Sequence, residues 1–199
     1  YGALKPAEIP WDMLTHLNHG FLTVSDGTPS DETFDWAPAP KYSLAFTDSW
    51  ADIWMDAGAG SGGIFKVYEL MHRIYPNVKI MLSVGGWTRG QMFSEMALKQ
   101  ETRKIFIDSC IDMLERMPWL AGIDLDWEYP GVFRDPTTDG LDDPVDFGSG
   151  IGGHDVSADR ENFTALLKEL RESMDAAGFE NKLLTICESA NYEQTAQTQ

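Results

Sequence analysis

Three acidic residues alternate with large apolar residues in one short stretch in the middle of the chain, residues 122–130. If this stretch is a β-strand, its side chains point alternately to two faces, and the apolar ones share one of them. The other face carries Asp124, Asp126 and Glu128, with neighbours about 7 Å apart. Carboxyl groups this close raise one another's pKa, because ionising one opposes ionising the next. Acids perturbed in this way gather at functional sites, so the row predicts acid–base chemistry.

The acidic row also has a direction along the strand. Tyr129, Pro130 and Gly131 end the strand, because proline lacks a ladder N–H and glycine permits a turn. Glu128 is therefore expected at the carboxyl end, where active sites of parallel α/β barrels form. A divalent-metal site is the rival interpretation, since hard cations bind carboxylates, but aromatic residues flank the row and no phosphate-binding loop appears.

The surrounding pattern predicts an α/β protein. Near-continuous or alternating apolar runs predict strands at 16–24, 78–84, 120–129 and 183–190. Apolar residues at intervals of three and four predict helices at 64–75, 91–117 and 158–177. The segments 25–63 and 131–157 are expected to be long loops. Strands that alternate with helices predict a parallel sheet with right-handed crossovers.

Composition and net charge exclude some classes of binding partner. The chain has 199 residues, 43% of them hydrophobic, which is enough for one core. A net charge of −17 argues against nucleic acid or an anionic membrane as a partner, and no apolar run is long enough to span a bilayer. Cys110 and Cys187 are expected to be buried free thiols. No histidine or acidic spacing indicates a metal, and no cofactor is expected.

Four segments resemble one family. Residues 124–130 resemble the D-x-x-D-x-D-x-E signature of glycoside hydrolase family 18, the chitinases, and residues 83–87 resemble its S-x-G-G-W signature. Residues 15–21 resemble its second-strand segment, T-H-I-N-Y-A-F, and residues 184–190 are similar to its fifth strand. Ala121 stands where the signature has its first Asp, which we interpret as a packing change.

The resemblance implies that residues 1–199 are a portion of one family 18 catalytic domain, a (β/α)8 TIM barrel, and hold its strands two to five. The first strand is expected before Tyr1 and strands six to eight after Gln199, in the parent chain or in an assembly. The family's M-x-Y-D segment and its late Trp are absent from this chain. The resemblance also implies a secreted or extracellular protein, and a fragment that is inactive without the rest of the barrel.

The activity implied by the resemblance is hydrolysis of β-1,4-linked N-acetylglucosamine in chitin or chito-oligosaccharides, with retention. Glu128 would protonate the leaving oxygen and then act as the base on water. The substrate's own acetamide would attack the anomeric carbon, Asp126 would orient that acetamide, and Asp124 would share a proton with Asp126.

Further residues are expected around these acids. Trp87, Tyr129 and Phe21 are assigned to substrate binding, although Trp87 suits core packing equally well. The supporting residues are Ser83, which can hydrogen-bond Asp124, and the pair Gly85 and Gly86, for which a turn at the strand end is the default interpretation.

Two rival functions stay open at this stage. An endo-β-N-acetylglucosaminidase would use the same acids. A chitinase-like carbohydrate-binding or scaffold subunit would need none of them, but inactive members of the family usually lose the residue that matches Glu128.

Overall fold

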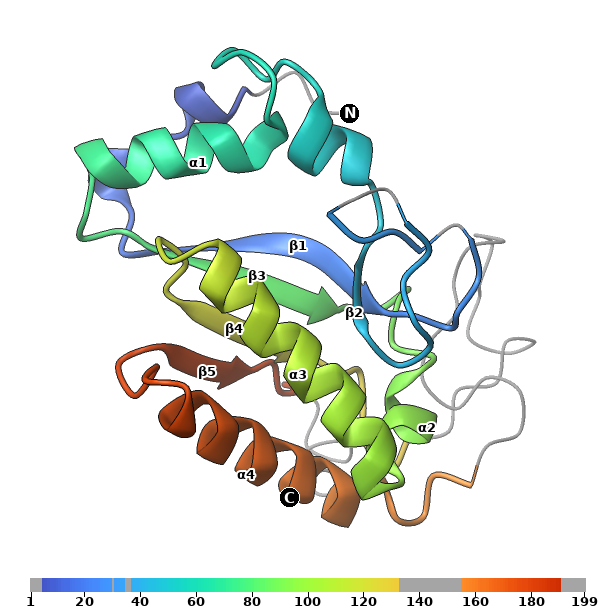
Figure 1. Ribbon diagram of the computed structural model, residues 1–199. Coiled ribbons are helices and arrows are strands. Elements are labelled where there is room, and N and C mark those ends of the chain that lie inside the picture. The colour runs from blue at the N-terminus through green and yellow to red at the C-terminus, as the bar shows by residue number, and fades with distance from the viewer. Residues whose placement is uncertain (1–4, 30, 35–36, 133–154, 191–199) are drawn as a thin grey trace.

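A twisted five-stranded sheet forms the centre of the computed structural model, which describes residues 5–29, 31–34, 37–132 and 155–190 (Figure 1). The strand order is β2-β1-β3-β4-β5. The strands are β1 (His16–Val24), β2 (Leu44–Phe46), β3 (Lys79–Gly85), β4 (Gly122–Asp126) and β5 (Leu183–Ile186). β1, β3, β4 and β5 are mutually parallel, as predicted, and β2 runs antiparallel to the end of β1.

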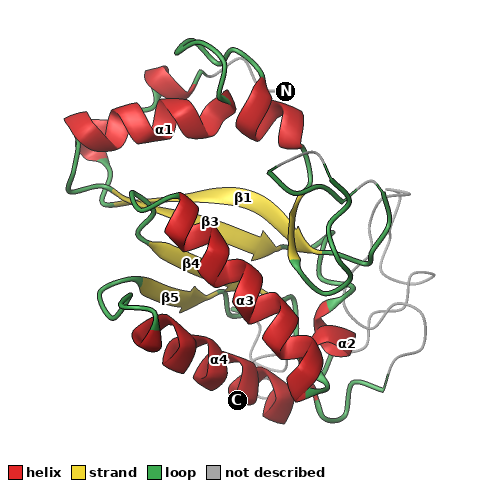
Figure 2. Cartoon of the chain, in the orientation of Figure 1, coloured by secondary structure: helices red, strands yellow, loops and turns green. Residues whose placement is uncertain are grey.

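Helices connect the parallel strands, as the alternation of patterns predicts (Figure 2). The helices are α1 (Gly63–Ile74), α2 (Phe93–Ala97), α3 (Gln100–Arg116) and α4 (Asp159–Ala176). Three short helical segments accompany them: η1 (Pro6–Glu8), η2 (Trp11–Met13) and η3 (Trp50–Trp54). Within the described ranges, none of the helices has the length and apolar character that crossing a bilayer requires.

The core lies between the sheet and its helices. Trp127 is 1% exposed and stacks on Phe93 at 5.2 Å between ring centroids, while Phe163 of α4 meets its edge at 5.3 Å. Ile123 and Leu125 of β4 are fully buried in the same cluster. The apolar face predicted for residues 122–130 is therefore the face that packs on the helices, and the acids lie on the opposite face.

Two of the predicted segments differ in detail. The predicted loop 25–63 contains β2 and η3, because three consecutive strand residues carry too short a pattern to be read from sequence. The predicted helix 91–117 is two helices, since Lys99 has extended backbone. The Thr102 hydroxyl donates to the carbonyl oxygens of Met96 and Lys99 at 2.7 and 2.9 Å, which satisfies acceptors at the break.

The last two parallel strands are shorter than predicted. β4 ends at Asp126 and β5 at Ile186, so Glu128 and Cys187 belong to the segments that follow the strands. Cys110 is buried as predicted, but the prediction for Cys187 is wrong, because its side chain is exposed at the end of the sheet.

An ion pair fixes α3 against α4. Arg103 donates to Glu169 through two nitrogen atoms, at 2.8 and 2.6 Å, and to the carbonyl oxygen of Ala97 at 2.8 Å. This bidentate contact joins the helices that follow β3 and β4, and so helps to set how these two strands lie side by side.

Candidate active site

Asp124 is anchored by hydroxyl groups from both neighbouring strands. The register places Ser83 of β3 and Thr185 of β5 opposite Asp124. Ser83 Oγ donates to Asp124 Oδ2 at 2.7 Å, which is the hydrogen bond predicted for this pair, and Thr185 Oγ1 donates to Oδ1 at 2.5 Å. Both oxygens of this buried carboxyl group are thus occupied, which holds it in one orientation.

Asp126 lies one step nearer the carboxyl end and is held less completely. It is 8% exposed, and hydrogen bonds link its carboxyl group to the Cys187 and Glu128 side chains. Its Oδ1 atom is buried and has no hydrogen-bond partner among the described residues. Burial raises the pKa of Asp126, the negative charge of Asp124 raises it further, and the two hydrogen bonds partly offset the rise.

Glu128 is half-buried beside this pair. Besides Asp126, it contacts the Tyr129 hydroxyl, whose pKa is raised by burial and then by the charge of Glu128. Tyr129 also hydrogen-bonds Ser189 beyond β5. The row of three acids therefore extends from the strand into the following segment, and the contact between Glu128 and Asp126 keeps it continuous.

The glycine pair after β3 forms a turn against the acids. Gly85 and Gly86 have φ of +104° and +79°, and the Gly86 N–H donates to the Asp126 carbonyl oxygen at 2.8 Å. A Cβ on Gly86 would lie 2.9 Å from the Phe21 ring. Gly85 and Gly86 thus form a turn at the end of β3. The backbone of this turn lies close to the Phe21 ring and to the Asp126 backbone.

A cavity of about 300 Å³ opens at this end of the sheet. Its lining residues are Asn18, Gly20, Phe21, Ser83, Asp124, Asp126, Ile186 and Cys187. Glu128 is not among them, but its carboxyl group contacts Asp126, which is. Phe21 is 40% exposed and Trp87, just after the turn, is 43% exposed, so both rings offer faces outside the core.

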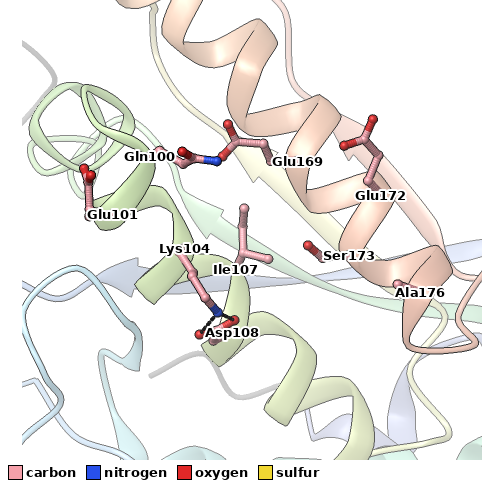
Figure 3. Close-up of a pocket in the computed structure, with 9 residues that line it drawn as sticks. All are labelled: Gln100, Glu101, Lys104, Ile107, Asp108, Glu169, Glu172, Ser173 and Ala176. Atoms are coloured by element: carbon pink, nitrogen blue, oxygen red, sulfur yellow. Dashed lines mark hydrogen bonds and ion pairs between the residues drawn. The ribbon is translucent and has the colours of Figure 1, made fainter.

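A larger groove, of about 430 Å³, lies elsewhere, between α3 and α4 (Figure 3). Within it Lys104 Nζ pairs with Asp108, and Ile107, Ser173 and Ala176 contribute small or apolar surface. The acidic row of β4 lies beside the smaller cavity and not in this groove, so we take the smaller cavity as the candidate site.

Sequence reasoning did not assign Thr185 and Cys187, the two residues that hydrogen-bond the acids from the β5 side. Their positions two residues apart in the predicted strand 183–190 match the spacing of Asp124 and Asp126, which would have indicated a shared face once that strand was placed next to β4. Ala121, the departure from the signature, lies at the entry to β4, where its N–H donates to the Ile80 carbonyl oxygen at 2.7 Å. It is thus at the opposite end of the strand from the acids.

No metal ligands converge in the part of the chain that the structure describes. There, no group of three or more His, Cys, Asp or Glu side chains is arranged to hold a metal ion.

Comparison with known proteins supports the same fold. Chitinase A1 of Niallia circulans is 29% identical over 97% of this chain, which spans 29% of that protein. Chitinase ChiA74 from Bacillus thuringiensis superposes with a TM-score of 0.79 at 29% identity, over 98% of this chain and 34% of that one. A family 18 N-acetylglucosaminidase from Paenibacillus barengoltzii matches at 0.65 and 25% identity, over 98% of this chain and 44% of that one.

The chain therefore spans less than half the length of these relatives. The chain superposes on a portion of their TIM-barrel domains, which confirms the predicted fold class. The family model for the glycosyl hydrolases of family 18 matches residues 1–198, nearly the whole sequence. With the two signatures now located on adjacent parallel strands, this match establishes that the chain belongs to glycosyl hydrolases family 18.

Proposed function

We propose that the protein containing this chain is a chitinase that hydrolyses β-1,4-linked N-acetylglucosamine in chitin or chito-oligosaccharides, with retention and with assistance from the substrate. The observation that carries the proposal is the Oδ1 atom of Asp126, a buried acceptor beside a cavity that has no hydrogen-bond partner in the described part of the chain. A buried acceptor without a partner is costly, and the N–H of a bound acetamide would satisfy it.

The roles follow from position. Asp126 holds the acetamide N–H, so that the acetamide oxygen attacks the anomeric carbon as the glycosidic bond breaks. Glu128, the outermost acid, gives its proton to the leaving oxygen and later takes one from the water that opens the cyclic intermediate. Asp124, fixed by two hydroxyl groups, shares a proton with Asp126, and its charge supports the raised pKa of Asp126.

Aromatic residues near the cavity provide the sugar contacts. We assign Phe21, Trp87 and Tyr129 to substrate binding, because partly exposed rings beside polar groups suit the apolar faces of sugar rings. Ser83, Gly85 and Gly86 support the acids from β3. The remaining barrel strands come from the parent chain or an assembly, and this portion alone is expected to be inactive. Because insoluble chitin cannot enter a cell, we place the protein outside the cell.

The test uses the full-length protein and a fluorogenic chito-oligosaccharide. Glu128→Gln should lower kcat about 100-fold or more, since general acid catalysis contributes about 10²–10⁴-fold. Glu115→Gln, on the exposed side of α3, is the matched control and should keep wild-type turnover. Equal turnover in Glu128→Gln and wild type would remove Glu128 as the acid.

The same preparation separates the rival functions. Proton NMR of the first product should show the β-anomer, as retention requires. Cleavage of a glycoprotein glycan in preference to chitotetraose would indicate an endo-β-N-acetylglucosaminidase. Binding to chitin without any turnover would indicate a carbohydrate-binding subunit.

A further inference from the structure

Cys187 lies directly beside the acid that is proposed to hold the acetamide. It is the first residue after β5, and its N–H donates to the Leu125 carbonyl oxygen at 3.2 Å, which continues the parallel pairing of Leu125 with Ile186. This register sets Cys187 next to Asp126, the last residue of the neighbouring strand β4. Both residues line the same cavity of about 300 Å³.

The orientation of the Asp126 carboxyl group is less constrained than that of Asp124. Asp124 is fixed at both oxygens by hydroxyl groups, whereas Asp126 is more than nine-tenths buried and its Oδ1 has no partner within the described ranges. A carboxyl group can turn about its terminal torsion, which is broad. The hydrogen bond with the Cys187 side chain comes from the residue that follows β5, beside Asp126, and so restrains that rotation.

The charges around Cys187 keep its thiol protonated. Although the Cys187 side chain is partly exposed at the end of the sheet, its partial desolvation, the charges of Asp126, Glu128 and Asp124, and the hydrogen bond to Asp126 together raise its pKa to about 11, with Tyr129 close by. A thiol in this environment is a donor rather than a nucleophile near neutral pH.

We propose that Cys187 is a positioning residue of this site: its thiol donates a hydrogen bond to the Asp126 carboxylate and keeps that carboxylate turned toward the cavity. The role deepens the proposed function and rests on it. It does not require the thiol to react with the substrate.

The first test measures the contact between Cys187 and Asp126 and does not depend on hydrolysis. The full-length protein is treated with iodoacetamide at pH 9, and alkylation of Cys187 is followed by peptide mass spectrometry. The Cys187 thiolate attacks the methylene carbon, a C–S bond forms, iodide leaves, and the thiol proton passes to buffer. Asp126→Asn removes the neighbouring charge and should speed alkylation about threefold or more, since half a pKa unit changes the thiolate fraction about threefold.

Cys110 is the internal control for that test, because it is fully buried and should stay unmodified in both proteins if the fold is intact. Equal alkylation rates of Cys187 in wild type and Asp126→Asn would overturn the proposal. This result is independent of hydrolysis. A folded wild-type protein without hydrolysis would contradict the proposed function, while the alkylation rates would still decide whether Cys187 contacts Asp126.

The second test measures the effect of Cys187 on the pH profile of kcat/KM. The hydrogen bond from Cys187 lowers the pKa of Asp126, so Cys187→Ala should move the acidic limb of kcat/KM upward by about half a pH unit. Cys187→Ser keeps a donor and should restore the wild-type profile. Cys110→Ala should lower the melting temperature and leave the profile unchanged. A Cys187→Ala profile like wild type, or a Cys187→Ser profile shifted as far as that of alanine, would overturn the role.

Discussion

A methyl group added to Gly85 should separate β3 from β4 at the site itself. An ideal Cβ on Gly85 would lie 2.5 Å from the carbonyl oxygen of Asp126 and 2.6 Å from Phe93 Cε2. The first of these atoms belongs to the backbone of the neighbouring strand, and the same oxygen accepts the Gly86 N–H at 2.8 Å. Gly85→Ala therefore cannot be relieved by rotating one side chain, and the carboxyl end of β4 must shift.

The cost of that change has two parts. Gly85 has φ of +104°, and an L-residue pays about 1–2 kcal/mol for left-handed backbone. Overpacking against fixed atoms adds about 1–3 kcal/mol, so Gly85→Ala should lower the free energy of unfolding by about 2–5 kcal/mol. Gly178, after α4, has φ of +82° with no atom within 4 Å of an added Cβ. Gly178→Ala should therefore show the backbone cost alone.

Urea unfolding of the full-length protein compares the two variants, and hydrolysis of a fluorogenic chito-oligosaccharide is measured under conditions where both remain folded. Gly85→Ala should be the less stable variant by about 1–3 kcal/mol and should lose most of its kcat, because Asp126 is displaced. Gly178→Ala should retain wild-type kcat. If the two variants are equally stable and equally active, the contact between the glycine turn and Asp126 does not organise the site.

Three further changes have definite expected outcomes. Arg103→Met breaks the bidentate pair with Glu169 and should cost several times more in urea unfolding than Lys104→Met, whose ion pair is well exposed and contributes about 0–1 kcal/mol. Asp126→Asn should raise the melting temperature at pH 7 but hardly at pH 3. The fold raises the pKa of this acid above 3.8, so stability falls as pH rises through that raised pKa. Thr185→Val removes the hydroxyl group that donates to Asp124, and should lower the free energy of unfolding by about 1.5–3 kcal/mol. An unchanged melting temperature would contradict this prediction.

Much of the site follows from local pattern. The alternation of Asp124 and Asp126 with Ile123 and Leu125 assigns opposite faces to acids and apolar residues, because side chains of a strand alternate with period two. A glycine pair after an apolar strand likewise indicates a turn. These properties depend on neighbours in sequence, so the sequence by itself determined which face carries the acids and at which end of the strand they cluster.

Other features depend on which strands are adjacent and in what register. Thr185 and Cys187 are about sixty residues from the acids they contact, and only the parallel pairing of β4 with β5 brings them there. The short strand β2 is likewise held by distant partners, since it pairs with β1 and the Leu44 N–H donates to Ser109 Oγ at 2.8 Å. The sequence predicted the hydrogen bond from Ser83 to Asp124, but only the tertiary structure shows that Thr185 holds the second oxygen of Asp124 and that Asp126 Oδ1 has no partner among the described residues, because hydrogen-bond partners depend on sheet register and not on spacing along the chain.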